Sequence, residues 1–185
     1  MLKLIDIKKS FGEKTVLNGV SLTIDDGQTL CIMGASGGGK TTLMRIACGL
    51  ILPDSGSVIF DYKKKSCVFQ ENRLLPWYDA LKNITCMGVS PDIAANYLQK
   101  VGLSGEEHTL PASLSGGMQR RLALARALAY GGDMFFLDEP FTGLDEGTKG
   151  DIISLLEQEL SDKTALMVTH DAAAAQRLGD KIINL

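Results

Sequence analysis

The sequence has little that would support a metal centre or a disulfide framework. Its 185 residues include only two histidines and four cysteines. The cysteines, Cys31, Cys48, Cys67 and Cys86, lie far apart and form no C-x-x-C pair. Cysteine in an apolar segment behaves as a small hydrophobic residue. We therefore expect buried, reduced thiols rather than a metal site or disulfides.

An excess of positive charge is also absent. The net charge is −3 and the isoelectric point is near 5.4, which gives no sign of a surface for nucleic acid. The main positive run, Lys63 to Lys65, comes shortly before the apolar stretch "CVF" and predicts a solvated turn. We expect no nucleic-acid partner.

Long hydrophobic runs are missing as well. No stretch approaches the roughly 18 apolar residues of a membrane-spanning helix. The N-terminal "MLKLIDIKKSF" interrupts its apolar residues with charges, unlike a signal peptide. These features favour a cytosolic protein that serves any membrane process by docking.

Short apolar stretches separated by turn residues predict strands. They cover residues 2–8, 15–24, 28–33, 56–60 and 66–70. Two further stretches, "DMFFLDEP" from Asp133 and "TALMVTH" from Thr164, read as short buried strands. Near-continuous apolar strands that alternate with helices are typical of a parallel sheet covered on both faces.

Helical patterns fill most of the remaining chain. They cover residues 40–50, 71–112, 118–129 and 151–160. Within the second, Ser90 and Pro91 are a good helix start, and Gly102 is a good end. We expect one α/β domain over residues 1–185, with a mainly parallel core (1–70 and 113–185), an N-terminal antiparallel β portion and an inserted helical lobe (71–112).

One glycine-rich segment, "GASGGGKT", fits G-x-x-x-x-G-K-[ST] with Gly34, Gly39, Lys40 and Thr41. A strand precedes this phosphate loop (residues 34–41) and a helix follows it. Glycines let backbone N–H groups turn toward phosphate oxygens, and the helix N-terminus adds its positive end. We expect Lys40 to bridge the β- and γ-phosphates and Thr41 to offer its hydroxyl to Mg²⁺. A flexible glycine turn is the alternative.

Three further side chains are predicted to meet this loop. Asp138 ends an apolar strand at the sheet edge where open α/β folds bind ligands. Its carboxylate would hold Mg²⁺ through water, and the next residue, Glu139, would orient or deprotonate an attacking water. His170 ends the strand "ALMVTH" at the same edge, which predicts a γ-phosphate contact rather than an ordinary strand-end histidine.

A second glycine loop, "LSGGMQ" at residues 114–119, resembles the signature motif of the ATP-binding cassette (ABC) ATPases, the nucleotide-binding subunits of ABC transporters. Gln70 in "VFQEN" matches that family's Q-loop, "GLD" at 143–145 its D-loop, and His170 its switch histidine. Phe11 falls where the family places an aromatic residue against adenine. These motifs span the whole chain in the family's order.

The resemblance implies a complete set of site residues. Those expected at ATP are Phe11, Gly34, Ser36, Gly37, Gly38, Gly39, Lys40, Thr41, Thr42, Ser115, Gly116, Gly117 and Asp145. Those expected at Mg²⁺ are Thr41, Gln70 and Asp138. The catalytic set is Glu139, His170 and Gln70.

The resemblance also implies a head-to-tail dimer, formed with a second copy or a paired ATPase subunit. The signature loop (114–119) of one subunit would close over the ATP bound by the other. Transmembrane permease subunits would be the further partners. The protein would then lie in the cytoplasm, peripheral on the inner face of the cell membrane through the permease.

The segment "ENRLLPWYDALKNI" from Glu71 resembles the same region of nitrate, sulfonate and taurine importer ATPases. Trp77 within it is expected either to line a groove for the permease or to lie in the core of the lobe.

Together these features predict a MgATP-hydrolysing subunit that powers a membrane permease, an importer by the same resemblance. A soluble ABC-type ATPase unconnected with transport is the alternative, although no coiled-coil insertion or basic face supports it. A non-hydrolytic nucleotide switch is a third, and Glu139 and His170 argue against it.

Overall fold

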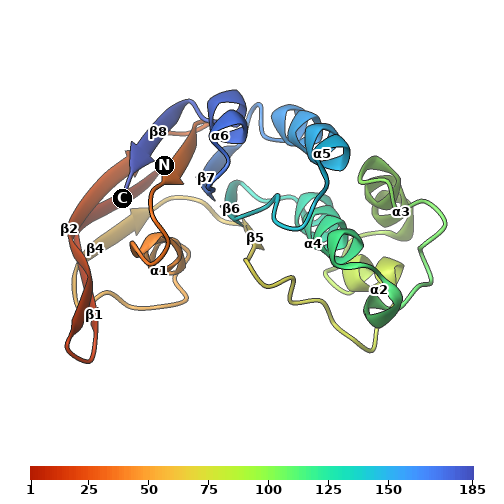
Figure 1. The fold of residues 1–185 in the computed structure, drawn as a ribbon, viewed down its shortest axis with the longest axis horizontal. Helices are drawn as coiled ribbons and strands as arrows, with labels where there is room; N and C mark the ends of the chain where they lie inside the picture. The colour runs from red at the N-terminus through yellow and green to blue at the C-terminus, as the bar shows by residue number, and fades with distance from the viewer.

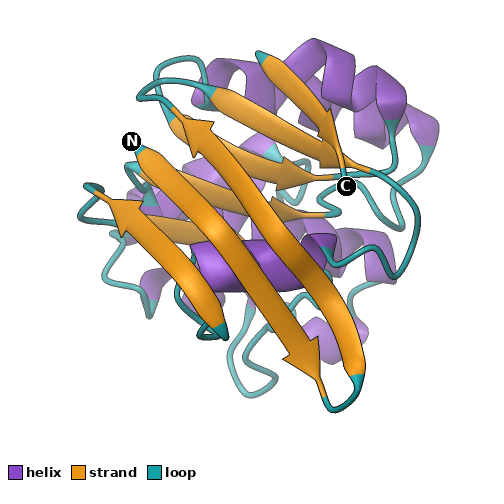
Figure 2. Cartoon of the chain, turned by 90° about the vertical axis from the view of Figure 1, so that its left-hand side faces the viewer, coloured by secondary structure: helices purple, strands orange, loops and turns teal.

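The computed structural model describes residues 1–185, which form two sheets with helices between and beside them. The smaller sheet is antiparallel and contains β1 (Leu2–Phe11), β2 (Lys14–Ile24) and β4 (Ser55–Phe60), in the order β2-β1-β4. Figure 2 shows this sheet in front, with a helix directly behind it. The predicted N-terminal antiparallel β portion is confirmed.

A bulge in β1 determines which of its side chains face the core. Leu2 and Leu4 are buried, but the next buried residue is Ile7, because the register shifts between Leu4 and Ile7. Asp6, inside the shift, has a φ of +49°. The extra residue lets both halves of β1 turn leucine or isoleucine inward.

The larger sheet has five parallel strands and positions the site. They are β5 (Lys65–Val68), β6 (Met134–Asp138), β7 (Thr164–Val168), β3 (Thr29–Met33) and β8 (Lys181–Asn184), in that spatial order. Every residue of β6 and β7 is buried. The carboxyl ends of β3, β6 and β7 therefore meet at one edge, which confirms the expected parallel core.

The helix α1 (Lys40–Ala47) lies between the two sheets (Figure 1, Figure 2). Its Leu43 and Ile46 pack in one buried cluster with Leu4 of β1 and with Phe136 and Leu166 of the parallel sheet. The first residue of α1 is Lys40, so this packing fixes where the phosphate loop ends.

Two helices, α4 (Gly116–Tyr130) and α5 (Glu146–Glu159), lie on the face of the parallel sheet opposite to α1. The prediction that the second of these begins at residue 151 was wrong. Asp145 caps α5, because its side chain accepts a hydrogen bond from Thr148 N at 3.0 Å, and the helix starts one residue later.

The lobe is less helical than predicted. It contains α2 (Ala80–Thr85), α3 (Pro91–Lys100) and a 3₁₀ turn at Pro111–Ser113, while residues 71–79 and 103–110 form no helix. Buried Asn83 explains the first gap. Its side-chain Oδ1 accepts a hydrogen bond from Leu75 N, and its Nδ2 donates to the carbonyl oxygens of Leu75, Tyr78 and Asp79, all at 2.8–3.1 Å. These hydrogen bonds stabilise a turn ahead of α2.

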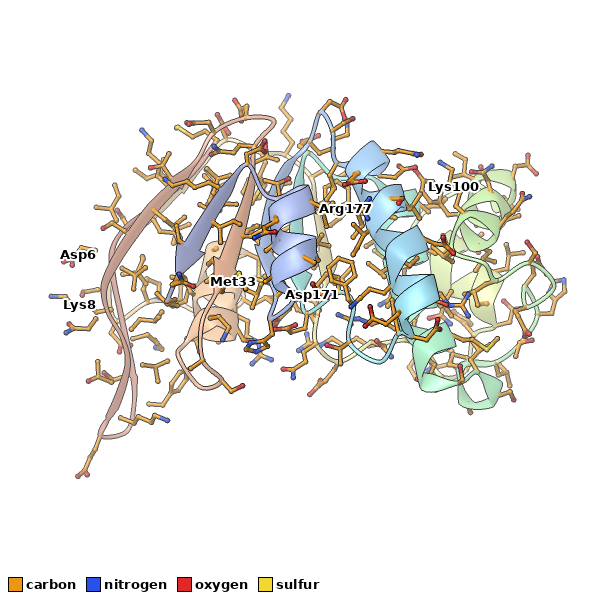
Figure 3. The ribbon with its side chains drawn as sticks, turned by 45° about the horizontal axis from the view of Figure 1, so that its top comes forward. Asp6, Lys8, Met33, Lys100, Asp171 and Arg177 are labelled. Atoms are coloured by element: carbon orange, nitrogen blue, oxygen red, sulfur yellow. The ribbon has the colours of Figure 1, made fainter.

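The lobe and the core share one hydrophobic interior. Ile84 and Leu98 of the lobe belong to the same buried cluster as Leu122 of α4 and Phe135 of β6. At the surface, Glu159 of α5 accepts from Lys100 Nζ at 2.6 Å and from Tyr97 OH at 2.7 Å. Figure 3 shows Lys100 on the lobe side of α5 and Arg177, from α6 (Ala172–Leu178), on the opposite side. There Arg177 Nε donates a hydrogen bond to the Glu157 carboxylate at 2.9 Å.

The cysteines, Trp77 and the helix lengths test three further predictions. All four cysteines are free, and Cys31 and Cys48 are buried, but Cys67 is half-buried and Cys86 is exposed. Trp77 is 68% exposed, so the lobe-core alternative for it was wrong. None of the helices combines the length and the apolar character needed to cross a bilayer.

Candidate functional site

A pocket of about 350 Å³ opens at the carboxyl edge of the parallel sheet. Eleven of the predicted site residues line it: Phe11, Ser36, Gly37, Gly39, Lys40, Thr41, Thr42, Gln70, Asp138, Glu139 and His170. The fold therefore brings together segments that lie as much as 159 positions apart in the sequence, from residue 11 to residue 170.

Glycine is required in the phosphate loop for steric reasons. Gly39 has a φ of +88° and precedes α1 directly. A Cβ atom there would lie 2.8 Å from Leu17 Cδ2 and 2.9 Å from Val16 O, so a side chain would collide with β2. Gly37, with a φ of +82°, faces open space and leaves room for a ligand.

Lys40 is buried, and two loop carbonyls hold its ammonium group. Nζ donates to Gly34 O at 2.8 Å and to Ala35 O at 2.7 Å. A lysine ammonium has three N–H donors, so one remains for a ligand in the pocket. The loop thus fixes a positive charge beside its own backbone amides and the N-terminus of α1, which together suit a phosphate chain.

Thr41 and Asp138 bring two oxygen atoms together. Thr41 Oγ1 donates to Asp138 Oδ1 at 3.3 Å, and Asp138 is only 2% exposed. Burial raises the pKa of Asp138, while the Thr41 hydroxyl, Arg45, Arg120 and Lys40 lower it. A hydroxyl and a buried carboxylate are ligands that suit Mg²⁺.

Glu139 and His170 lie side by side in the pocket. His170 Nε2 lies 3.2 Å from Glu139 Oε1, within ion-pair distance, and His170 N donates to Oε2 at 3.3 Å. Oε1 is buried and faces the His170 ring without a well-aligned hydrogen bond. Burial raises the pKa of Glu139, and attraction to His170 lowers it.

Glu139 also has a strained backbone. Its φ is +49°, a region that costs a residue other than glycine of order 1 kcal/mol. Its N–H donates to Val168 O of β7 at 2.8 Å, which holds the residue directly after β6. This turn sends the Glu139 side chain toward the pocket and His170.

Phe11 and Gln70 line the pocket from two further strands. Phe11 ends β1 and is 52% exposed, as expected of a ring that can stack on a base. Gln70 is exposed two residues beyond the end of β5. The structure thus brings both predicted residues to this pocket.

The structure does not place the signature loop in this pocket. Ser115 and Gly116 are exposed, and Ser115 Oγ caps α4 by accepting from Met118 N at 3.2 Å. Gly117 packs on Gly143, whose carbonyl would lie 3.0 Å from an added Cβ. Asp145 also lies outside the pocket, as the cap of α5. Gly34 and Gly38 do not line the pocket either, although Gly34 O accepts a hydrogen bond from Lys40.

Sequence reasoning missed three residues. Val16 of β2 and Val168 of β7 line the pocket. Arg120 of α4 is buried and donates to the carbonyls of Asp138 and Glu139. In the sequence, the two valines are distinguished only by the alternation of apolar residues in a strand. Nothing in the sequence distinguishes Arg120 from other charged residues of a helix.

A parallel sheet, a glycine-rich loop that runs from one strand into a helix, and an acidic pair at the end of the next strand but one define the class of P-loop nucleotide hydrolases. Within that class, the family described as ABC transporter matches residues 17–142. The chain belongs to this family.

Proteins similar to this chain are named as import ATP-binding proteins. The chain is 41% identical over 184 residues to the aliphatic sulfonates import ATP-binding protein SsuB 1 of Frankia alni, and 40% and 39% identical to similarly named proteins of Frankia casuarinae and Rhodococcus jostii. These matches cover 97–100% of the chain but 68%, 62% and 70% of the three relatives.

Solved structures of an ABC transporter cassette have the same fold as this chain. The dimeric structure of MJ0796, a bacterial ABC transporter cassette, has a TM-score of 0.92 at 32% identity and covers the whole chain and 94% of that cassette. A dimeric post-hydrolysis state of the same cassette, bound to ADP and Pi, has a TM-score of 0.91 at the same identity and the same coverage of both chains.

His170 is expected to affect the pH dependence of hydrolysis through Glu139. Replacing it (His170→Ala) removes the imidazole, whose attraction lowers the pKa of Glu139, and leaves the contributions of the His170 backbone N–H and of Lys40. That pKa then rises further, so Glu139 becomes protonated at a higher pH as the solution is acidified. We expect the acidic limb of the pH profile of kcat/KM for ATP hydrolysis to move to higher pH, with a lower plateau.

The matched control is His108→Ala, since His108 lies in the lobe beside Asp79. It should leave the profile in place. An acidic limb that stays fixed or moves to lower pH in His170→Ala would contradict the pairing with Glu139.

Proposed function

We propose that this chain is the MgATP-hydrolysing subunit of an ABC importer, and that it works as one ATPase domain over residues 1–185. The observation that carries the proposal is buried Asp138 and half-buried Glu139 in one pocket with Lys40, with His170 within ion-pair distance of Glu139. The single interior shared by the lobe and the core supports one domain rather than two.

The phosphate chain of ATP would lie along the phosphate loop. The third N–H of Lys40 would contact the β- and γ-phosphates, while loop amides and the N-terminus of α1 add positive potential. Phe11 would stack on adenine at the open side of the pocket. Such stacking contributes about 1–3 kcal/mol.

Mg²⁺ would bind with ATP rather than alone. No group of three or more histidine, cysteine, aspartate or glutamate side chains could hold a metal ion. Thr41 and Asp138 already place two oxygen ligands together, and Gln70 lines the same pocket. The ion would neutralise negative charge on the phosphates, and phosphate oxygens and water would complete its coordination.

Glu139 would be the general base. Its carboxylate would accept a proton from the attacking water, and its raised pKa brings it closer to the range in which a base is effective. His170 would contact the γ-phosphate and keep the Glu139 carboxylate oriented. A non-hydrolytic switch would need neither arrangement.

The second half of the site would come from a partner subunit. Ser115 and Gly116 are exposed at the N-terminus of the 15-residue helix α4, outside the pocket of their own chain. The Ser115 hydroxyl, the backbone amides of the loop and the N-terminus of α4 would form an anion site. This site would close over the γ-phosphate of the ATP bound by the other subunit. ATP would then join two chains, and hydrolysis would release them.

The transport role rests on the family and its named relatives. Three of these relatives are named as import ATP-binding proteins for aliphatic sulfonates, so we propose import, with an aliphatic sulfonate as the substrate class. The chain would act on the inner face of the cell membrane, attached to permease subunits. A soluble ATPase unconnected with transport is supported by no feature of the structure.

Replacing the proposed base (Glu139→Gln) should leave ATP binding intact, because Lys40 and Phe11 are unchanged. Hydrolysis should slow by about 10²–10⁴-fold, and an ATP-dependent dimer should accumulate. Phosphate release and size-exclusion chromatography with ATP measure the two effects. Near-normal turnover in this variant would count against Glu139 as the base.

A mixed dimer tests which chain completes which site. Lys40→Ala and Gly117→Asp should each be inactive as homodimers. When they are mixed, one site carries both lesions and the other carries none. Mixing should therefore restore ATP hydrolysis, up to about one site's worth and less if the sites are cooperative.

Its control places both changes on one chain and mixes that chain with wild type. Every site of the control heterodimer then carries one lesion and should contribute little. Activity in this heterodimer, with none in the first, would mean that the signature loop serves its own chain's nucleotide.

The exposed ring of Trp77 tests the docking surface. Trp77→Ala should change the free energy of unfolding by less than about 0.5 kcal/mol, because the ring is 68% exposed. Basal ATPase activity should also persist, while stimulation by the copurified permease should fall. Unchanged stimulation would count against a docking role for the ring.

A further inference from the structure

Arg120 lies in α4, four residues after Gly116, and is only 2% exposed. Its guanidinium faces the turn that carries the proposed base. Nη2 donates to Asp138 O and to Glu139 O, both at 2.6 Å, and Nε donates to Pro140 O at 3.2 Å. One side chain of α4 therefore bonds three consecutive carbonyls at the end of β6.

The remaining nitrogen faces a different segment. Nη1 donates to Phe69 O and to Asn72 Oδ1, the latter at 3.2 Å. These acceptors lie on either side of Gln70 in the sequence. A guanidinium has five N–H donors, and the five contacts account for all of them.

The charge of Arg120 is bonded to carbonyl groups, with no direct contact to a carboxylate oxygen. Burial lowers its pKa to about 10, and attraction to Asp138 and Glu139 raises it. Arg120 thus stays cationic at neutral pH. Leaving these acceptors without donors would be costly in a buried position.

Glu139 depends on this contact because its backbone is strained. Its N–H bonds Val168 of β7, while its carbonyl accepts from Arg120. With a φ of +49°, the residue keeps its direction only where neighbours on both sides fix it. The same guanidinium fixes the segment on each side of Gln70.

We propose that Arg120 is a positioning residue that holds Glu139 and Gln70 in register for hydrolysis and couples them to the signature loop at the start of α4. The inference rests on the proposed function, because it assumes that this loop contacts the ATP of the partner. A shift of α4 on that contact would move the Glu139 turn in the same chain. Arg120 would then carry part of the coupling between the two sites of the dimer.

The test is Arg120→Lys, which keeps the positive charge but concentrates all donors on one atom. Its three N–H donors cannot replace the five that Arg120 directs at five acceptors. We expect kcat for ATP hydrolysis to fall by about 10–100-fold, the scale of a small misplacement of catalytic groups. The dissociation constant for ATP should change by no more than about two-fold, and the Hill coefficient should fall toward 1.

Arg121→Lys is the matched control. Arg121 is the next residue of α4, but its Nη1 donates to Val101 O at 2.8 Å and Gly102 O at 2.7 Å, at the end of α3. It should lower the thermal midpoint, as a merely structural arginine does, and leave kcat and the Hill coefficient near wild type. If Arg120→Lys fails to fold, Arg120→Gln, which keeps two N–H donors, takes its place in the same assays.

Wild-type kcat and cooperativity in the Arg120 variant would overturn the proposal. So would equal losses of kcat in both arginine variants, since those would reflect packing of α4. A fall in kcat and in the Hill coefficient confined to the Arg120 variant supports it. Wild-type protein that hydrolyses no ATP would instead refute the proposed function and this inference together.

Discussion

The parallel alignment of β3, β6 and β7 is the constraint on which the rest of the site depends. Parallel strands end at one edge, so β3 delivers the phosphate loop, β6 delivers Asp138 and Glu139, and β7 delivers His170 to the same place. Complete burial of β6 and β7 makes this register hard to change. The small antiparallel sheet adds Phe11 from outside and covers α1.

Charges gathered at this edge are only partly matched to one another. Asp138 and Lys40 are buried, Glu139 is half-buried and lies beside His170, and Lys40 has one spare donor. Burying ionic groups is costly unless other charges or hydrogen bonds offset the cost. A phosphate chain with its cation would satisfy these groups together, which explains why the site suits a nucleotide better than a small neutral ligand.

The helix α4 links three functions along its length. Its first residues are the exposed signature loop, Arg120 contacts the Glu139 turn, and its apolar face packs against both the lobe and the parallel sheet. In the proposed dimer, movement of the lobe or of a partner at the signature loop would therefore reach the Glu139 turn through this one helix. This connection gives a physical route between ATP, a second subunit and a docked permease.

The sequence by itself determined the phosphate loop, the acidic pair and His170 at strand ends, and the cap of α3 at Ser90, because each depends on neighbouring residues. It failed where a distant side chain decides local structure. Residues 71–79 follow a helical pattern, yet buried Asn83 stabilises a turn there. Exposure of Trp77 and Cys86 likewise depends on which faces the lobe buries. Arg120 contacts Phe69, 51 positions away, and only the packing of α4 beside β5 and β6 brings the two together.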